Sequence, residues 1–218
     1  MFISSDPKKK YLLAAILVIL AINASLGQAK LGLKLTSSII SQRVSQDNDS
    51  IQIGHGSNAF VPSFALLADF PLSTNYYFAT GIGYISKRVN LVYNNPEFGL
   101  RDNQAYNIQY IQLPATIKLY TNEVALDKRL YFQFGPIIEI AVHNKESKDY
   151  LIVIQDFQPV DITLLLATGM EFQLGPNTAL MAGFHYSRGL INIVKSAPGY
   201  GDLVIKNDLF GIDLALKF

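Results

Sequence analysis

The chain has 218 residues, of which 50% are hydrophobic and only 16% are charged, and it contains no cysteine. This composition excludes a disordered chain, disulfides, thiol catalysis and cysteine-ligated metal centres. The formal net charge of +1 lacks the strongly basic character of nucleic-acid-binding proteins, so no nucleic acid is expected as a partner.

The first 29 residues show the order of features that is typical of a secretory signal peptide. Three lysines at 8–10 precede an apolar run at 11–22, and small residues follow this run. The run is shorter than the roughly 20 residues that a membrane-spanning helix needs. We therefore predict a signal peptide over 1–29, cleaved after Gly27 or after Ala29, and a single domain over 30–218.

The remainder of the chain predicts eight strands in which apolar and polar residues alternate. Besides the last strand at 208–218, they are expected near 31–36, 63–70, 78–84, 111–119, 132–142, 163–172 and 180–187. An even number of such strands predicts an all-β fold, an eight-stranded antiparallel up-and-down barrel.

The connections between these strands are expected to alternate in length. Short turns are predicted at 71–75, 121–128 and 175–177, and long polar loops at 41–58, 90–105, 144–158 and 195–207. All long loops would then emerge at one end, as in transmembrane barrels with short periplasmic turns and long extracellular loops. Both termini would lie on the periplasmic side.

Alternation by itself fits two barrels, a soluble one that buries its apolar face and a membrane one that exposes it. The polar face is mainly glycine and alanine with few charges, which suits the narrow interior of eight strands better than a solvated exterior. The apolar face carries no charge within the strands, and a Lys or Arg there would cost about 2–4 kcal/mol in lipid. We therefore predict a transmembrane barrel. The strand charges on the polar face are Lys34, Asp69, Lys87, Lys118, Glu139, Glu171, Asp213 and Lys217.

Aromatic residues are expected to form girdles at the two membrane interfaces, because their rings are apolar in body and polar at the tip. The short-turn girdle would contain Phe70, Tyr76, Tyr120, Tyr131, Phe172 and Phe218. The long-loop girdle would contain Tyr84, Tyr93, Tyr106, Tyr110, Tyr150, Phe157 and Tyr186.

The end of the chain resembles the C-terminal targeting strand of bacterial outer-membrane barrels, which alternates and ends in an aromatic residue. The resemblance implies that the barrel-insertion machinery reads the row Phe210, Ile212, Leu214, Leu216 and Phe218. Two further segments, YIQLPATIKLY at 110–120 and TGMEF at 168–172, are similar to strands of the PorT-like outer membrane protein beta-barrel family. This similarity implies a Gram-negative outer-membrane location. Most members of that family have no assigned activity, so the role of PorT in secretion is not transferred.

The lumen charges are the first candidates for a functional site. Paired charges would fill and rigidify a narrow lumen, and Lys34 is expected to reach Asp213 because the first and last strands adjoin. The alternative is a gated polar path, that is, a narrow porin-like conduit for small solutes. The predicted network comprises Lys34, Asp69, Lys118, Glu139, Glu171, Asp213 and Lys217.

An outer-membrane enzyme is a second alternative. His143 and Asp161 are expected near the extracellular rim of adjacent strands, and His185 points into the lumen two residues before Ser187. No nucleophile motif accompanies them, and the three histidines lack a short metal-ligand spacing, so no catalytic residue, metal or cofactor is assigned. The loop at 41–58, with Asp47 and Asp49, is either a solvated loop or a site for an external ligand.

These observations favour a structural or interaction protein that presents four extracellular loops around a plugged lumen. The expected partners are outer-membrane lipids, the barrel-insertion machinery and another protein of the envelope.

Overall fold

A computed structural model describes residues 29–46, 52–95, 100–146, 154–196 and 202–218. Except for Ala29, the predicted signal peptide lies outside the described residues, as do Asp47 and Asp49. Within the described residues, no helix is long and apolar enough to cross a membrane.

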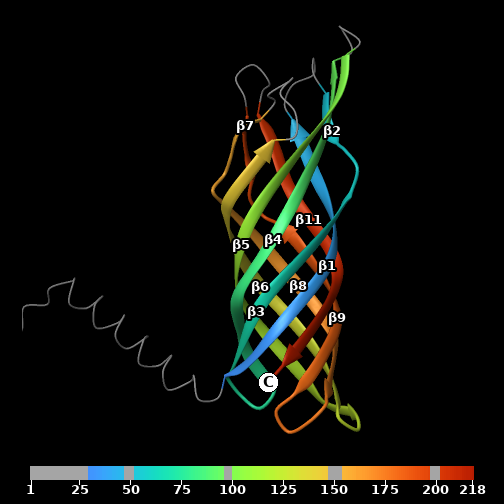
Figure 1. Cartoon of the computed structure of the whole chain (residues 1–218), viewed down its shortest axis with the longest axis vertical. Helices are drawn as coiled ribbons and strands as arrows, with labels where there is room; N and C mark the ends of the chain where they lie inside the picture. The colour runs from blue at the N-terminus through green and yellow to red at the C-terminus, as the bar shows by residue number, and fades with distance from the viewer. Residues whose placement is uncertain (1–28, 47–51, 96–99, 147–153, 197–201) are drawn as a thin grey trace, which may run out of the picture.

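Eight antiparallel strands close into a ring, which confirms the predicted barrel (Figure 1). Chain neighbours pair around the ring, and the last strand pairs with the first to close it. The chain ends at one end of the barrel, here called the short-turn end, and the opposite end is called the long-loop end (Figure 1). The ring strands are β1 (Lys30–Gln46), β3 (Ala59–Pro71), β4 (Tyr76–Asn95), β5 (Leu100–Ala125), β6 (Lys128–Glu146), β8 (Val160–Gln173), β9 (Ala179–Gly189) and β11 (Leu203–Lys217).

The outer surface near the short-turn end is a belt of exposed apolar side chains, here called the apolar band. On β1 it runs from Leu31 to Ile39, and the row Phe210 to Phe218 continues it along β11 to the last residue, with each residue of that row 40–57% exposed. Nine residues at about 3.3 Å each, tilted by about 40°, give a height of about 23 Å, close to the ~25 Å of outer-membrane barrels. Water would not stabilise such a belt, whereas lipid would.

The short-turn end is built from tight connections. Only Leu126 and Asp127 separate β5 from β6, and Asp127 adopts the left-handed conformation (φ 59°), which Asp tolerates better than most residues. The strands therefore continue through most of the predicted turn at 121–128.

Where the structure describes them, the four segments expected as long polar loops are mostly strand, so these loop bounds are wrong. The ring strands extend into them, and three short strands are added there: β2 (Gln52–His55), β7 (Ile154–Phe157) and β10 (Val194–Ser196). β2 pairs with the extended part of β4, and β7 pairs with β10.

The outward alternation of apolar residues does not predict these extensions, because in them the apolar residues point inward. On β1, the apolar residues from Leu31 to Ile39 face out. Beyond them the apolar Ile40 and Val44 face in, while the polar Ser41 and Arg43 face out. The change of phase occurs at the doublet Ile39–Ile40, and this doublet pairs directly with Phe210 and Leu209 of β11. The barrel therefore has two zones: apolar outside near the short-turn end, and apolar inside near the long-loop end.

The inward apolar residues of the second zone pack into one cluster, here called the apolar plug. Its members come from the ring strands and from β2, β7, β10 and the segment before β10. It comprises Ile40, Ile53, Val61, Ile85, Val89, Leu91, Tyr93, Tyr106, Ile108, Tyr110, Ile154, Phe157, Ile193, Val194, Leu203, Ile205 and Leu209.

The predicted aromatic girdles are corrected by the same finding. Tyr93, Tyr106, Tyr110 and Phe157 lie inside the plug, and Tyr120 and Tyr131 are buried in the lumen near the short-turn end. These residues occupy inward-facing positions of their strands, so their rings cannot reach the membrane interface. By contrast, Tyr76 and Phe218 are about half exposed, as the girdle requires.

Candidate functional site in the barrel lumen

The structure places the seven predicted network residues on the inward face of the ring. Six of them are at most 5% exposed, and the seventh, Lys34, has a side chain that is 24% exposed. They do not form one network. They belong instead to three clusters, which we call the lower, central and upper clusters in order from the short-turn end.

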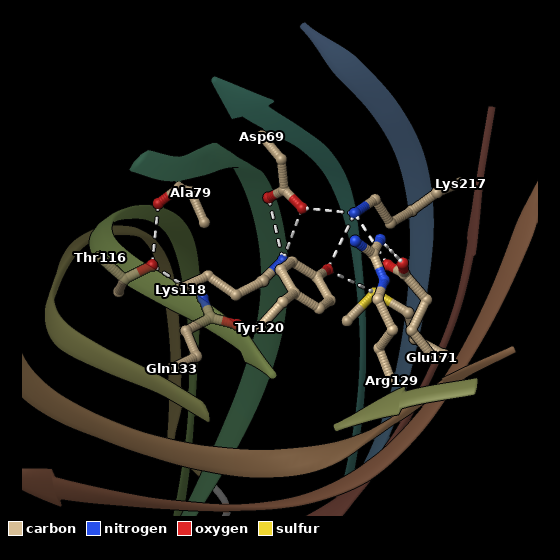
Figure 2. A network of polar contacts seen from close by, with 10 residues as sticks. Asp69, Ala79, Thr116, Lys118, Tyr120, Arg129, Gln133, Glu171 and Lys217 are labelled. Atoms are coloured by element: carbon tan, nitrogen blue, oxygen red, sulfur yellow. Dashed lines mark hydrogen bonds and ion pairs between the residues drawn. The ribbon is translucent and has the colours of Figure 1, made fainter. Parts of the chain in front are cut away.

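The lower cluster is centred on the Asp69 carboxylate at the end of β3 (Figure 2). The Lys118 ammonium of β5 donates to both of its oxygens, at 2.9 and 2.8 Å, and the Lys217 ammonium of β11 lies 2.8 Å from Oδ2. Lys217 also lies 3.1 Å from Glu171 of β8. Salt bridges thus connect four strands across the lumen.

Two members of the lower cluster were not predicted from the sequence. Arg129 of β6 forms an ion pair with Glu171 at 2.5 Å, and its guanidinium carbon lies 4.7 Å from the centre of the Tyr120 ring. The Tyr120 hydroxyl accepts a hydrogen bond from Lys217 at 2.9 Å (Figure 2). Both residues lie on inward positions, but Arg129 falls between the predicted turn at 121–128 and the predicted strand at 132–142, and Tyr120 is predicted for the girdle.

The central cluster surrounds Asp213 of β11. Lys34 of β1 lies 3.7 Å from its carboxylate, as the adjacency of β1 and β11 predicts, and Thr36 donates a hydrogen bond to Oδ1 at 2.7 Å. His185 of β9 points into the lumen, and its Nδ1 lies 3.1 Å from Oδ1 of Asp213. Its other ring nitrogen, Nε2, lies 3.2 Å from the Ser38 hydroxyl of β1.

Ser38, His185 and Asp213 therefore follow the order of contacts in a hydrolytic triad. Their packing differs from that of a hydrolase. Ser38 is only 1% exposed, and a Cβ atom on Gly211 would lie 2.6 Å from its Oγ and 2.7 Å from the His185 ring. Ser38 and His185 therefore pack closely against the Gly211 backbone, and the buried hydroxyl has little room beside it for a substrate carbonyl.

The upper cluster consists of Lys87 of β4, Glu139 of β6 and Asp161 of β8, and each is at most 1% exposed. Lys87 forms an ion pair with Glu139 and another, at 3.2 Å, with Asp161. Gln112 donates a hydrogen bond to the second oxygen of Glu139 at 2.7 Å, and the Lys87 ammonium lies 5.1 Å from the centre of the Tyr110 ring.

Formal charges balance over the three clusters together. The lower cluster has three cations and two carboxylates, the central one has one of each, and the upper one has one cation and two carboxylates. A buried charge without a partner costs several kcal/mol, so this balance allows the lumen to be polar without being filled by water.

The structure does not bring the predicted rim pair together. Asp161 lies opposite Glu139 in the β6–β8 ladder and is bound to Lys87, whereas His143 is exposed and lies opposite Gln109 of β5. Within the described residues, no group of three or more His, Asp or Glu side chains could hold a metal ion.

A cavity of about 40 Å³ lies in the lumen beside the central cluster. Its lining includes Lys34, Lys118, Gln133 and Asp213. Its walls are mixed, and its size suits about three water molecules beside the polar groups, whereas a path for larger solutes would need much more room.

Comparison with known proteins supports the fold. The family model described as "Outer membrane protein beta-barrel domain" matches residues 23–195. No curated protein sequence matches the chain. Among solved structures, the outer membrane protein OprG from Pseudomonas aeruginosa is similar in fold, with a TM-score of 0.53 and 9% identity over 87% of this chain and 96% of that one.

Two further solved structures align at lower scores. Neisserial surface protein A has a TM-score of 0.45 at 15% identity, with 85% of this chain and 97% of that one covered. The outer membrane protease OmpT from Escherichia coli has a TM-score of 0.39 at 13% identity, with 87% and 96% covered.

The pairing of Asp69 with two lysines leads to a stability prediction. Asp69→Asn should lower the free energy of unfolding by about 3–5 kcal/mol, because Lys118 and Lys217 would lose a buried counter-charge. Urea unfolding in lipid vesicles, followed by heat-dependent gel mobility, measures the change.

The exposed pair Lys195–Asp156 provides the control, since its atoms lie 4.0 Å apart and its side chains are 54% and 60% exposed. Asp156→Asn should change stability by about 0–1 kcal/mol. Adding Lys118→Met to Asp69→Asn should restore part of the lost stability. Equal effects of Asp69→Asn and Asp156→Asn would refute the role of the lower cluster.

Proposed function

The chain belongs to the outer membrane protein beta-barrel domain family and is located in the outer membrane, and we propose that it serves there as a closed structural or interaction barrel. Under this proposal the lumen does not transport solutes, and the long-loop end is the surface presented to partners.

The observation that carries the proposal is the apolar plug above the paired charges. A solute that entered from the long-loop end would have to displace Ile40, Val89 and Ile205, which are all 0% exposed. It would then have to separate Lys87 from Glu139 and Asp161, and further on Lys118 and Lys217 from Asp69. Each separation would leave buried charges unpaired.

Conductance tests whether the barrel is closed. The purified protein in planar bilayers is expected to show no steady nanosiemens-scale conductance. The double variant Asp69→Ala with Lys118→Ala is expected to stay closed too, because it opens only the lower cluster and leaves the plug in place. Stable large channels from the wild-type monomer would favour the narrow conduit instead.

We also propose that the short-turn end faces the periplasm and the long-loop end faces the outside. Short turns at one end of a membrane barrel are typical of the periplasmic side. The start of β1 and the last residue of the chain both lie at that end, since the backbone of Phe218 exchanges two hydrogen bonds with Leu31, at 2.9 and 3.2 Å.

The absence of cysteine allows a direct test of this orientation. A single cysteine replacing the exposed Ser45, in the long-loop part of β1, should react with a membrane-impermeant maleimide on intact cells. A cysteine replacing the exposed Ser73, in the turn after β3, should react only after the outer membrane is permeabilised. The opposite pattern would reverse the orientation.

A hydrolase is the second candidate function, and the contact order of Ser38, His185 and Asp213 is the observation that favours it. The closed-barrel proposal predicts that a fluorophosphonate probe leaves the folded protein unlabelled, because Ser38 is covered by its neighbours. Mass spectrometry of the intact protein detects the adduct. Labelling of the wild type that disappears in Ser38→Ala would establish a reactive serine and a hydrolase.

A further inference from the structure

Three basic side chains lie together on the outer surface of β9, β11 and β1. Arg43 of β1 pairs in the ladder with Lys206 of β11, and Arg188 of β9 pairs with Asp208 of β11. Because β9, β11 and β1 are consecutive in the ring, these side chains form one patch, which we call the basic patch. Its members are Arg43, Arg188 and Lys206, with Asp208 between them.

The basic patch begins where the apolar band ends. On β9, Arg188 is the next outward residue after Tyr186. On β11, Asp208 and Lys206 are the next outward residues beyond Phe210. On β1, Arg43 is the second outward residue beyond Ile39. The patch therefore lies at the depth where the headgroups of the surrounding lipids meet the barrel.

The single acidic residue of the patch is already bound. Asp208 accepts two hydrogen bonds from Arg43, at 2.8 and 3.1 Å, and the same guanidinium donates to the Gly189 carbonyl at 2.6 Å. Among the residues that the structure describes, neither Arg188 nor Lys206 takes part in an ion pair. Two cations of the patch therefore remain available to an external anion.

Basic residues gather mainly on these three neighbouring strands of the barrel. On the far side, the outward residues at the corresponding level are uncharged, for example Asn107 and Gln109 of β5 and Val160 of β8. Arg88 of β4 is also exposed, but β3 separates its strand from β1. Basic residues that serve only a general attraction to the membrane surface would not need to gather on three neighbouring strands.

We propose that the basic patch binds the phosphate groups of anionic lipids in the leaflet at the long-loop end. A guanidinium presents paired N–H donors that match phosphate oxygens, and an ammonium adds a further charge. The acyl chains of the same lipid would lie against Phe210 and Tyr186 in the apolar band directly below. One lipid would therefore satisfy both surfaces at once, which free phosphate in water cannot do.

The test compares lipids that differ in headgroup charge. The full-length protein in detergent is incubated with phosphatidylglycerol or phosphatidylcholine of the same chain length, and native mass spectrometry counts the lipids retained. The wild type should retain phosphatidylglycerol in preference. Replacing one basic residue should reduce this preference about fivefold, and the Arg188→Gln, Lys206→Gln double variant should reduce it by more than tenfold.

Arg101→Gln is the matched control, because Arg101 is an exposed arginine on β5 at the long-loop end, far above the band. It should leave the preference unchanged, and heat-dependent mobility verifies that each variant is folded. Equal retention of both lipids by the wild type, or an equal loss in Arg101→Gln, would overturn the proposal. Displacement of the lipid by an equal concentration of inorganic phosphate would overturn the assignment to a lipid.

Discussion

The interior of an eight-stranded ring is too narrow for a continuous column of water, so each inward charge must find its counter-charge within the protein. Five cations and five carboxylates meet this constraint in three clusters. Several of the partners come from strands that do not adjoin, as where Asp69 of β3 is bound by Lys118 of β5 and Lys217 of β11. The contacts that neutralise the lumen thus also link strands that share no backbone ladder.

The same strands meet two different surroundings along their length. Near the short-turn end lipid covers the outside, so apolar residues face outward and the interior can be polar. Near the long-loop end the outer side chains are polar, as at Ser41 and Arg43, and the apolar residues turn inward to form the plug. The change takes place at Ile39–Ile40, directly opposite Leu209–Phe210. The basic patch, the apolar band and the plug all take their positions from this change of phase.

Much of the lumen could be predicted from sequence, because a period of two assigns each residue of a strand to a face. Lys34 and Asp213 could even be paired, since closure of the ring makes β1 and β11 neighbours. The partnership of Lys87 with Glu139 and Asp161 could not, because it joins β4, β6 and β8 across the lumen. The contact of Ser38 with His185 likewise depends on the register of three strands.

By itself, the sequence determined the number of ring strands, the antiparallel barrel and the face of each strand that meets lipid, because alternation is a local property of the chain. Only the tertiary structure decided which charges pair between strands that do not adjoin, how far the strands extend and which aromatic rings lie inside. Those outcomes depend on strand register and on the diameter of the closed ring, and both arise from contacts between distant segments. The doublet Ile39–Ile40 marks the change of phase in the sequence. The structure shows that this change occurs at the same level on β11, because the doublet pairs with Phe210 and Leu209.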